Sequence, residues 1–480
     1  MRASPHRFAL ALCLGLAFAD VLRVGLRVGL PVAALIAAGT RVLAPESRCA
    51  AVALSVALAG WTWGSARIEV LDHSALAARI GTAERARLVV TGPPALSRFE
   101  TRVPATAVVW GGERVHEPVL LKLPHGRAPP QGAVVELVGE LRAPNDYEKT
   151  WLRRHGVHVV VRSATWRVVG RRGGIGGVAD RLRGRLARAV ALGLHGERKA
   201  LLQGIVLGDG SGLSEELRAR FRASGLYHLL AVSGQNVALV AGGALLLGWV
   251  VGMPRLVSEI GALAAIVAYV LAVGAQPSVV RAGIAGVLGS LAWLTARARD
   301  RSYFLLVGAV VLLGWNPYAL LDPGFELSFV AVVSIFMLAP RIRHRLEAYP
   351  MPDGLRDVVA VSTACGLATA PISWLHFHAL ALLTIPANAL AAPAVVPLLG
   401  FAFAAAVVAP LSPGAAGALA WLNGWCAAYL AACARLIGGL PAAQIRSTRA
   451  LLVVLAVALL VAAYASDRRD VQRAKKPRLG

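Results

Sequence analysis

The sequence of 480 residues has little charge: Asp, Glu, Lys and Arg together make up 16% of it, whereas hydrophobic residues make up 57%. Its mean hydropathy is +0.62. This balance argues against a soluble globular protein and predicts a polytopic membrane protein. Acidic residues are especially scarce, 26 against 50 basic ones, so the formal net charge is +24. A basic surface attracts the phosphates of nucleic acid or of anionic membrane lipid, and the sequence alone leaves both open.

Several catalytic patterns are also missing from the sequence. There is no G-x-x-x-x-G-K-[ST] phosphate loop, so an ATP motor within this chain is not expected. His376 and His378 in WLHFHAL lack the carboxylate and further histidines of a dinuclear metal site. Ser233 lacks the G-x-S-x-G elbow of hydrolases, and the five cysteines show no CxxC spacing. We therefore expect no catalytic residue, no metal and no cofactor, and the chain is not expected to be an enzyme.

Three apolar stretches open the chain, at about 8–22, 28–43 and 49–64. They predict an N-terminal transmembrane region at 1–65, with the first stretch retained as a span instead of being removed as a signal peptide. Because Arg2 and Arg7 precede the first stretch, the amino end should stay in the cytoplasm. After three crossings, the next domain should lie outside.

From about 66 to 170 the sequence changes to short β-forming runs separated by turn signals such as Gly111-Gly112. Strands are expected at 87–91, 103–110, 114–123, 133–141 and 157–169. Five short strands with alternating faces favour a small closed barrel, and we expect an OB-like domain.

The barrel region carries the residue types with which OB barrels bind single-stranded nucleic acid, namely aromatic rings for stacking and basic groups for phosphates. The DNA-binding candidates are Trp110, Arg142, Tyr147, Trp151, Arg153, Arg154, Arg162 and Trp166. The alternative is that the aromatic rings fill the barrel core and the arginines are simply solvated.

Residues 171–224 read as a glycine hinge followed by amphipathic helices. In the run 178–194, apolar residues share one face, with Arg181, Arg185 and Arg188 on one flank and Arg183 on the other. This pattern is typical of a helix that lies in the membrane interface. It would serve either to anchor the chain to lipid or as a basic rim for an anionic substrate.

Residues 225–465 are apolar almost throughout. Further spans are expected at about 226–250, 259–273, 279–296, 303–313, 325–338, 358–374, 380–408, 418–440 and 450–464. Prolines break the stretch at 380–408. The basic loops at 297–301 and 341–345 and the basic tail at 466–480 should face the cytoplasm. The fold class is therefore a mostly α polytopic protein of the cytoplasmic membrane with about 10–12 transmembrane helices, cytoplasmic termini and a small extracytoplasmic β-barrel.

Polar side chains inside these apolar runs are the channel candidates, because a polar group at membrane depth costs several kcal/mol unless it finds a partner or water. They are His228, Ser233, Gln235, Asn236, Arg281, Glu326 and Asn388. On a continuous helix His228, Gln235 and Asn236 share about a third of the circumference, with Ser233 on another side. These residues also have structural interpretations. The four at 228–236 would form hydrogen bonds between helices, and Arg281 would extend its charged end to the membrane surface. Glu326 would be attracted to the positive N-terminal end of its own helix.

One stretch, LLQGIVLGDGSGLSEELRARFRASGLYHLLAVSGQNVALV, resembles the signature of the ComEC family of competence DNA-uptake channels. PSVVRAGIAG, DPGFELSF and LLTIPANALAAPAVVPL follow in the family's order, and NDYEKTWLRRHGV resembles the end of its OB-like domain. Many members have His-Val where this chain has Asn236-Val237. Many also carry a C-terminal metallo-β-lactamase-like domain that these 480 residues lack, so a nuclease is expected, if at all, as a separate protein.

The resemblance implies an inner-membrane channel that takes single-stranded DNA into the cytoplasm during natural transformation. It also implies a cytoplasmic, ATP-driven, helicase-like translocase and an extracytoplasmic DNA-receptor protein as partners. A negative interior opposes each entering phosphate by about 2.3 kcal/mol per elementary charge per 100 mV, and the chain has no motor motif, which favours the same partner. Two alternatives remain: a secondary transporter of a small anionic solute, and a non-conducting envelope protein of the same fold.

Overall fold

The computed structural model describes residues 5–40, 42–97, 99–274, 276–295, 300–441, 443–450 and 452. The span expected at 450–464, the tail at 466–480 and most of the loop at 297–301 therefore lie outside the described residues. The chain divides into two compact units. The first comprises Met1–Leu213, His228–Phe329 and Ala394–Ala428, and the second comprises Ser214–Tyr227, Val330–Pro393 and Tyr429–Gly480.

Three helices open the first unit, as the sequence predicts: α1 (Pro5–Phe18), α2 (Leu26–Gly39) and α3 (Pro45–Asp72). α1 and α3 pack closely through glycine. A Cβ added to Gly15 would lie 1.9 Å from the carbonyl oxygen of Ala57, and one added to Gly60 would lie 2.8 Å from that of Leu12. Small residues that let two backbones approach are a common device of membrane helices. α3 continues past the expected end at residue 64 to Asp72.

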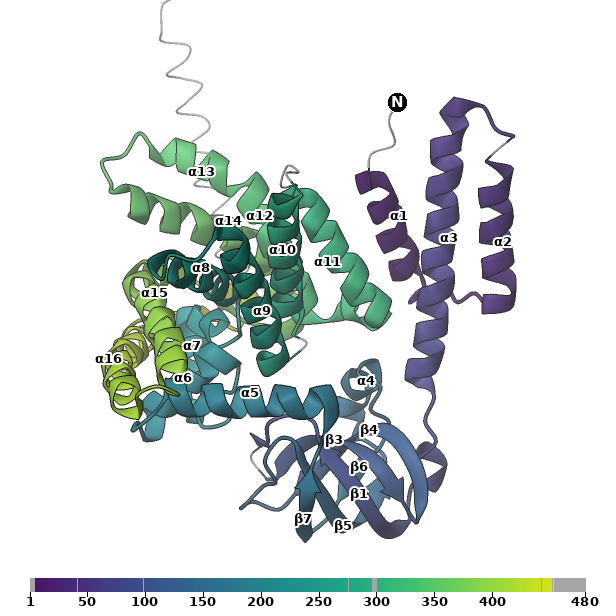
Figure 1. The fold of residues 1–480 in the computed structure, drawn as a ribbon, viewed down its shortest axis with the longest axis horizontal. Helices are drawn as coiled ribbons and strands as arrows, with labels where there is room; N and C mark the ends of the chain where they lie inside the picture. The colour runs from purple at the N-terminus through teal and green to yellow at the C-terminus, as the bar shows by residue number, and fades with distance from the viewer. Residues whose placement is uncertain are drawn as a thin grey trace, which may run out of the picture. The chain divides into compact units, whose positions relative to one another are not determined.

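The next part of the first unit is a seven-stranded sheet (Figure 1). Its strands are β1 (Ala83–Val90), β2 (Ala95–Leu96), β3 (Thr101–Trp110), β4 (Glu113–Leu123), β5 (Ala133–Arg142), β6 (Val160–Arg162) and β7 (Trp166–Arg171). β1 pairs with both β3 and β5, so β1, β3, β4, β6 and β5 form a near-closed ring. β4 and β6 run parallel, and the other pairs are antiparallel. Alternate residues such as Leu88, Val103 and Leu121 are fully buried inside the ring. The expected small barrel is thus confirmed.

Two features of the barrel differ from the expectation. The strand expected at 157–169 is two strands, β6 and β7, because the chain turns at Ser163, whose hydroxyl lies 2.7 Å from the carbonyl oxygens of Val138 and Thr165. A short helix, α4 (Asp146–Arg154), precedes β6. It has acidic residues in its first turn and basic residues in its last, the order that the helix dipole favours.

A buried group of charges holds α4 on the barrel. Lys122 Nζ on β4 lies 2.9 Å from Glu148 Oε2 on α4 and 2.9 Å from Glu100 Oε1, and Arg102 also pairs with both carboxylates. The side chains of Lys122 and Glu148 are each 7% exposed, so water screens their attraction little. Burial alone would raise the pKa of Glu100, but hydrogen bonds from Lys122 and Arg102 outweigh it and hold that pKa below its ordinary value.

Acid should therefore weaken the barrel. Because the pKa of Glu100 is lowered in the folded chain, its contribution to stability is fully present above the pKa of the unfolded chain and is lost as pH falls through the lowered value. Denaturant melts of the full chain in detergent, repeated at several pH values, measure the free energy of unfolding. Glu100→Gln should reduce the fall in this free energy at low pH, whereas Glu113→Gln, at an exposed position, should leave the fall unchanged. The same fall in the Glu100→Gln variant as in the wild-type chain would contradict the stabilising role of the Glu100 carboxylate.

After the barrel come α5 (Gly174–Val190) and α6 (Gly196–Leu207) of the first unit and α7 (Glu215–Ser224) of the second. α5 is the amphipathic helix that the sequence predicts. Arg181, Arg185 and Arg188 are exposed, but Arg183 is buried. The arginines on the two sides of this helix therefore face different surroundings.

Helices expected from the apolar runs of 225–440 are all present. They are α8 (Gly234–Val250), α9 (Arg255–Val273), α10 (Pro277–Leu294), α11 (Arg301–Trp315), α12 (Pro323–Met337), α14 (Asp353–Phe377), α15 (Thr384–Val408) and α16 (Pro413–Gly438). Short elements join them: η2 (Leu226–Leu229), η3 (Pro317–Leu321), α13 (Ala339–Leu346), β8 (Leu380–Ala381) and β9 (Gln444–Ile445). Two expectations are corrected. The helix expected from 226 begins only at Gly234, and α15 runs unbroken through its three prolines.

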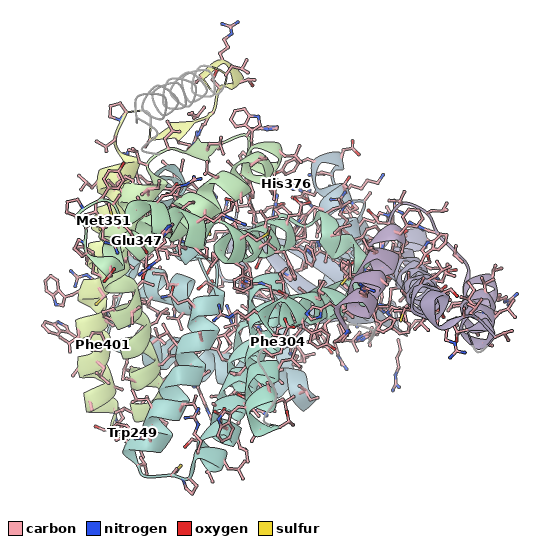
Figure 2. The ribbon with its side chains drawn as sticks, turned by 90° about the horizontal axis from the view of Figure 1, so that it is seen from above. Trp249, Phe304, Glu347, Met351, His376 and Phe401 are labelled. Atoms are coloured by element: carbon pink, nitrogen blue, oxygen red, sulfur yellow. The ribbon has the colours of Figure 1, made fainter. Side chains whose placement is uncertain are left out.

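Within the described residues, six helices are long and apolar enough to cross a membrane, or seven if the bent pair α12 and α13 is one span. Four more apolar helices, α1, α2, α8 and α11, have fewer than the 18 residues taken here as the length of a full span. The expected count of ten to twelve spans stays a prediction. The outward surfaces suit lipid: Trp249 near the end of α8, labelled in Figure 2, is 76% exposed.

Candidate functional site

The polar stretch at 228–236 lies between η2 and the first turn of α8. Ser233 is the residue before α8, and its hydroxyl donates to Asn236 Oδ1 at 3.0 Å. Asn236 is 3% exposed, whereas His228 and Gln235 are exposed. A continuous helix would have placed His228 beside Asn236 and kept Ser233 apart. Since α8 begins at Gly234, the structure instead pairs Ser233 with Asn236 and leaves His228 outside the helix.

Three consecutive carbonyls in the last turn of α6 are capped by side chains from three other helices. Asn236 Nδ2 of α8 donates to Ile205 O at 2.9 Å, and Tyr269 Oη of α9 donates to Val206 O at 2.7 Å. Arg183 Nη1 of α5 donates to Leu207 O at 3.1 Å. Carbonyls in a last helical turn have no partner within the helix, so this set of contacts supplies what α6 lacks. We call Arg183, Asn236 and Tyr269 the α6 caps.

Arg183 joins a second helix end to this group. Its Nη1 also lies 3.2 Å and 3.3 Å from the carbonyl oxygens of Ala272 and Val273, where α9 ends. Asp209 lies 3.8 Å away, beside the left-handed Gly208 that ends α6. A cation at two helix C-termini is favourable, because their exposed carbonyls carry partial negative charge. The site therefore fixes α5, α6, α8 and α9 to one another.

Arg281 lies in the second turn of α10, against α12. Its Nε donates to Ser328 Oγ at 3.0 Å, and its guanidinium carbon lies 5.9 Å from the centre of the Phe329 ring. The side chain is half-buried, and no carboxylate in the described part of the chain forms an ion pair with it. Gly234 is close by, since an added Cβ there would lie 3.8 Å from Arg281 Nη2. A guanidinium held in this way keeps donors free for an anion.

The remaining two channel candidates are Glu326 of the first unit and Asn388 of the second. Glu326 is half-buried in the first turn of α12, and Asp322 caps that turn by accepting from the backbone N–H groups of Gly324 and Phe325. The expected N-cap is thus present, with Pro323 as the first helical residue. Asn388 belongs to the second unit, where its Nδ2 donates to Ser362 Oγ at 3.0 Å.

The barrel candidates divide by exposure. Trp110 is fully buried in the barrel core, so its ring is not free to stack on a base, whereas Trp166 packs against that core and stays partly exposed. Arg142 is exposed and bound through two hydrogen bonds to Glu140, and Arg162 lies 3.9 Å from Glu100. These two arginines remain on the surface, as the sequence analysis expects.

The other four barrel candidates are all on α4. Tyr147 is 91% exposed and Trp151 is 57% exposed, with the His155 ring centre 4.3 Å from that of Trp151. Arg153 Nη2 lies 2.8 Å from Asp72 Oδ2, at the end of α3. Arg154 Nη1 lies 3.5 Å from Leu321 O. The aromatic and basic residues of this helix therefore face different neighbours.

A groove of about 530 Å³ on the outside of the barrel was not expected. It is lined by Arg87, Val108, Val109, Arg114, Val115 and His116. Val108 is the extra residue of a β-bulge in β3, and Val109 pairs with Arg87 on one side and Arg114 on the other. Bulges re-aim side chains and often lie beside binding sites. Arg87 on one side of the valines is paired with Glu136, whereas Arg114 and His116 lie on the other side. In the sequence, only the alternation of Arg114 and His116 along β4 indicates this groove.

The comparisons with known proteins decide the family. A protein-family model described as "Competence protein" matches residues 205–468, more than half of the chain. The chain belongs to the competence protein family. Its competence-family segment contains Asn236, Tyr269 and Arg281, whereas Arg183 precedes it.

A relative supports this assignment to the competence family. The chain is 30% identical over 194 residues to "ComE operon protein 3" of Bacillus subtilis (strain 168). The match covers 40% of this chain and 24% of that protein, so this chain matches only about a quarter of the relative's length. No solved structure matches the chain.

Proposed function

We propose that this competence-family membrane protein is a channel through which single-stranded DNA enters the cytoplasm during natural transformation. The observation that carries the proposal is the family match over 205–468, which spans α8 to α16. In this proposal the barrel lies outside the cell and both chain termini lie in the cytoplasm. In this proposal the described helices conduct the DNA and perform no chemistry on it.

Arg281 supports the proposal physically. DNA carries a charge on every nucleotide, and each phosphate must leave water for the helical part of the protein. A half-buried guanidinium that pairs with no carboxylate among the described residues offers that phosphate a charge-assisted contact. Because Ser328 and Phe329 hold the group in place, little ordering is needed when the phosphate arrives.

Entry against a negative interior needs energy from a partner. At about 2.3 kcal/mol per elementary charge per 100 mV, each phosphate is opposed by the membrane potential. We propose that a cytoplasmic, ATP-driven, helicase-like translocase pulls the strand and that an extracytoplasmic receptor delivers the DNA. The groove beside the bulge in β3 would receive the strand from that receptor.

The groove makes its own prediction. Arg114→Ala should weaken binding of a thymidine oligonucleotide to the full chain in lipid nanodiscs by about three- to tenfold, because one phosphate contact is lost. The slope of log affinity against log salt should fall by roughly 0.7, the value for one neutralised phosphate on a single strand. Fluorescence anisotropy at several salt concentrations measures both. Arg172→Ala is the matched control, because the guanidinium of Arg172 is engaged by Asp180 and does not line the groove. Equal binding by the Arg114→Ala and wild-type chains would remove the groove from the path.

Deletion of the gene tests the proposed function. Labelled DNA should still bind the cell surface in the deletion strain but should no longer reach the cytoplasm, and the wild-type gene should restore entry. Normal entry in a deletion strain without a paralogue would overturn the proposal. If the deletion strain instead loses uptake of a small anion, the wild-type gene restores that uptake and DNA entry is unaffected, the secondary transporter is favoured.

A further inference from the structure

α4 presents three differently occupied sides. Glu148 and Leu152 are buried against the barrel, and the arginines of the last turn reach the helical part of the first unit. Tyr147 and Trp151, one turn apart, lie on a third side and are 91% and 57% exposed. The His155 ring lies beside Trp151, and both Tyr147 and Trp151 keep most of their surface exposed.

This helix is attached directly to the ends of apolar helices. Asn316, the residue after α11, donates from Nδ2 to the carbonyl oxygen of Arg154 at 2.9 Å. Arg153 binds Asp72, the last residue of α3, through two hydrogen bonds of 3.0 Å and 2.8 Å. Figure 1 shows α4 on the side of the barrel that faces α3 and α11. α4 therefore lies level with the ends of these two apolar helices.

Exposed tryptophans mark the same level on the helices themselves. Trp315, the last residue of α11, is 74% exposed and has the guanidinium of Arg67 5.6 Å from its ring centre. Trp63 is 56% exposed, and its Nε1 donates to Gly314 O at 2.9 Å. Tryptophan and tyrosine gather at the boundary between hydrocarbon and water, with arginines reaching to the headgroups. Asp72 is five residues beyond Arg67 on α3, which is about 8 Å of helix, close to the thickness of one headgroup layer.

We propose that Tyr147 and Trp151 of α4 insert into the phospholipid headgroup layer of the outer leaflet. The face that they form continues the belt of the exposed Trp63 and Trp315, whose rings are 56% and 74% exposed. The contact holds the barrel against the membrane beside the apolar helices. It does not depend on the proposed conduction of DNA.

Photo-crosslinking tests the contact in the full chain. Tyr147 is replaced by p-benzoylphenylalanine, and the protein is placed in nanodiscs of phosphatidylcholine and phosphatidylglycerol. Illumination should give a phospholipid adduct, detected by mass spectrometry, whose yield does not change when a thymidine oligonucleotide is added. The control is the same replacement at Val138, a 57% exposed residue of β5, whose pairing partners are all barrel strands. It should give no lipid adduct.

Two outcomes would overturn the proposal. An adduct to the oligonucleotide in place of lipid would make α4 a DNA-stacking surface, and equal lipid yields at positions 147 and 138 would make the contact nonspecific. A second measurement guards against a misfolded variant. Brominated lipid should quench a smaller share of tryptophan emission in Trp151→Phe than in the wild-type chain, and an unchanged share would also contradict the insertion.

Discussion

Cells that carry Arg281→Ala are expected to take up DNA into the cytoplasm about ten- to a hundredfold less than wild-type cells. A charge-assisted hydrogen bond to a passing phosphate is worth about 1.5–3 kcal/mol, and each 1.4 kcal/mol is a factor of ten in rate. The measurement is entry of labelled DNA in the deletion strain complemented with each variant, normalised to the amount of protein in the membrane. Surface-bound DNA should not change.

Three further variants separate the charge from its surroundings. Arg281→Lys keeps the charge but loses the planar donors and should recover part of the uptake. Ser328→Ala leaves the guanidinium in place but removes the hydrogen bond to its Nε, so a smaller loss is expected. Arg345→Ala, on the exposed side of α13, should behave as wild type. Wild-type uptake by Arg281→Ala at normal protein levels would contradict the proposed phosphate contact.

The second large effect is on stability. Arg183→Met should lower the free energy of unfolding by about 3–5 kcal/mol, the range for removing one partner of a buried charge interaction. Methionine fills much of the volume but leaves the carbonyls of Leu207, Ala272 and Val273 without the donor that Arg183 provides. Unpartnered buried carbonyls are costly because their water has been removed and not replaced. Thermal or denaturant melts of the purified chain in detergent measure the loss.

α5 offers a matched control for this variant. Arg185→Met changes the same residue type on the exposed side of the same helix, and it should cost under about 0.5 kcal/mol. Arg183→Lys should fall between the two, because an ammonium keeps the positive charge but has no counterpart of the second guanidinium nitrogen, Nη2, which lies 3.8 Å from Asp209. Similar melts for Arg183→Met and Arg185→Met would mean that the α6 caps do not hold the helices together.

The elements of the fold could be predicted from the sequence because their patterns are local. Alternation within 83–142 is enough to place the long strands of the barrel, and apolar runs place the helices from α8 to α16. Errors occur where a local pattern has two interpretations. The run from 226 is apolar enough to be helical throughout, but α8 begins only at Gly234, and Ser233, the residue before it, donates a hydrogen bond to Asn236 in the first turn.

The candidate site depends on contacts that no local pattern carries. Arg183 donates hydrogen bonds to carbonyls up to 90 residues away in the sequence. The local pattern of the run 178–194 does not distinguish it from the other three arginines of that amphipathic helix. Asn236 stands out in the sequence as a polar residue within an apolar run, but its hydrogen-bond partner, the carbonyl of Ile205, cannot be predicted from the sequence. The groove on the barrel also could not be predicted from the sequence, because it depends on a bulge that places Val109 between arginines of two other strands.

A voltage across a planar bilayer can stand in for the missing motor, and this gives the most direct test of conduction. The purified chain is inserted into the bilayer and single-stranded DNA is added on the side of the barrel, with the opposite side made positive. We expect transient current blocks and amplifiable DNA on the far side, with fewer events in Arg281→Ala and none with double-stranded DNA. An ion-tight bilayer, or blocks without any DNA crossing, would contradict a channel for single-stranded DNA.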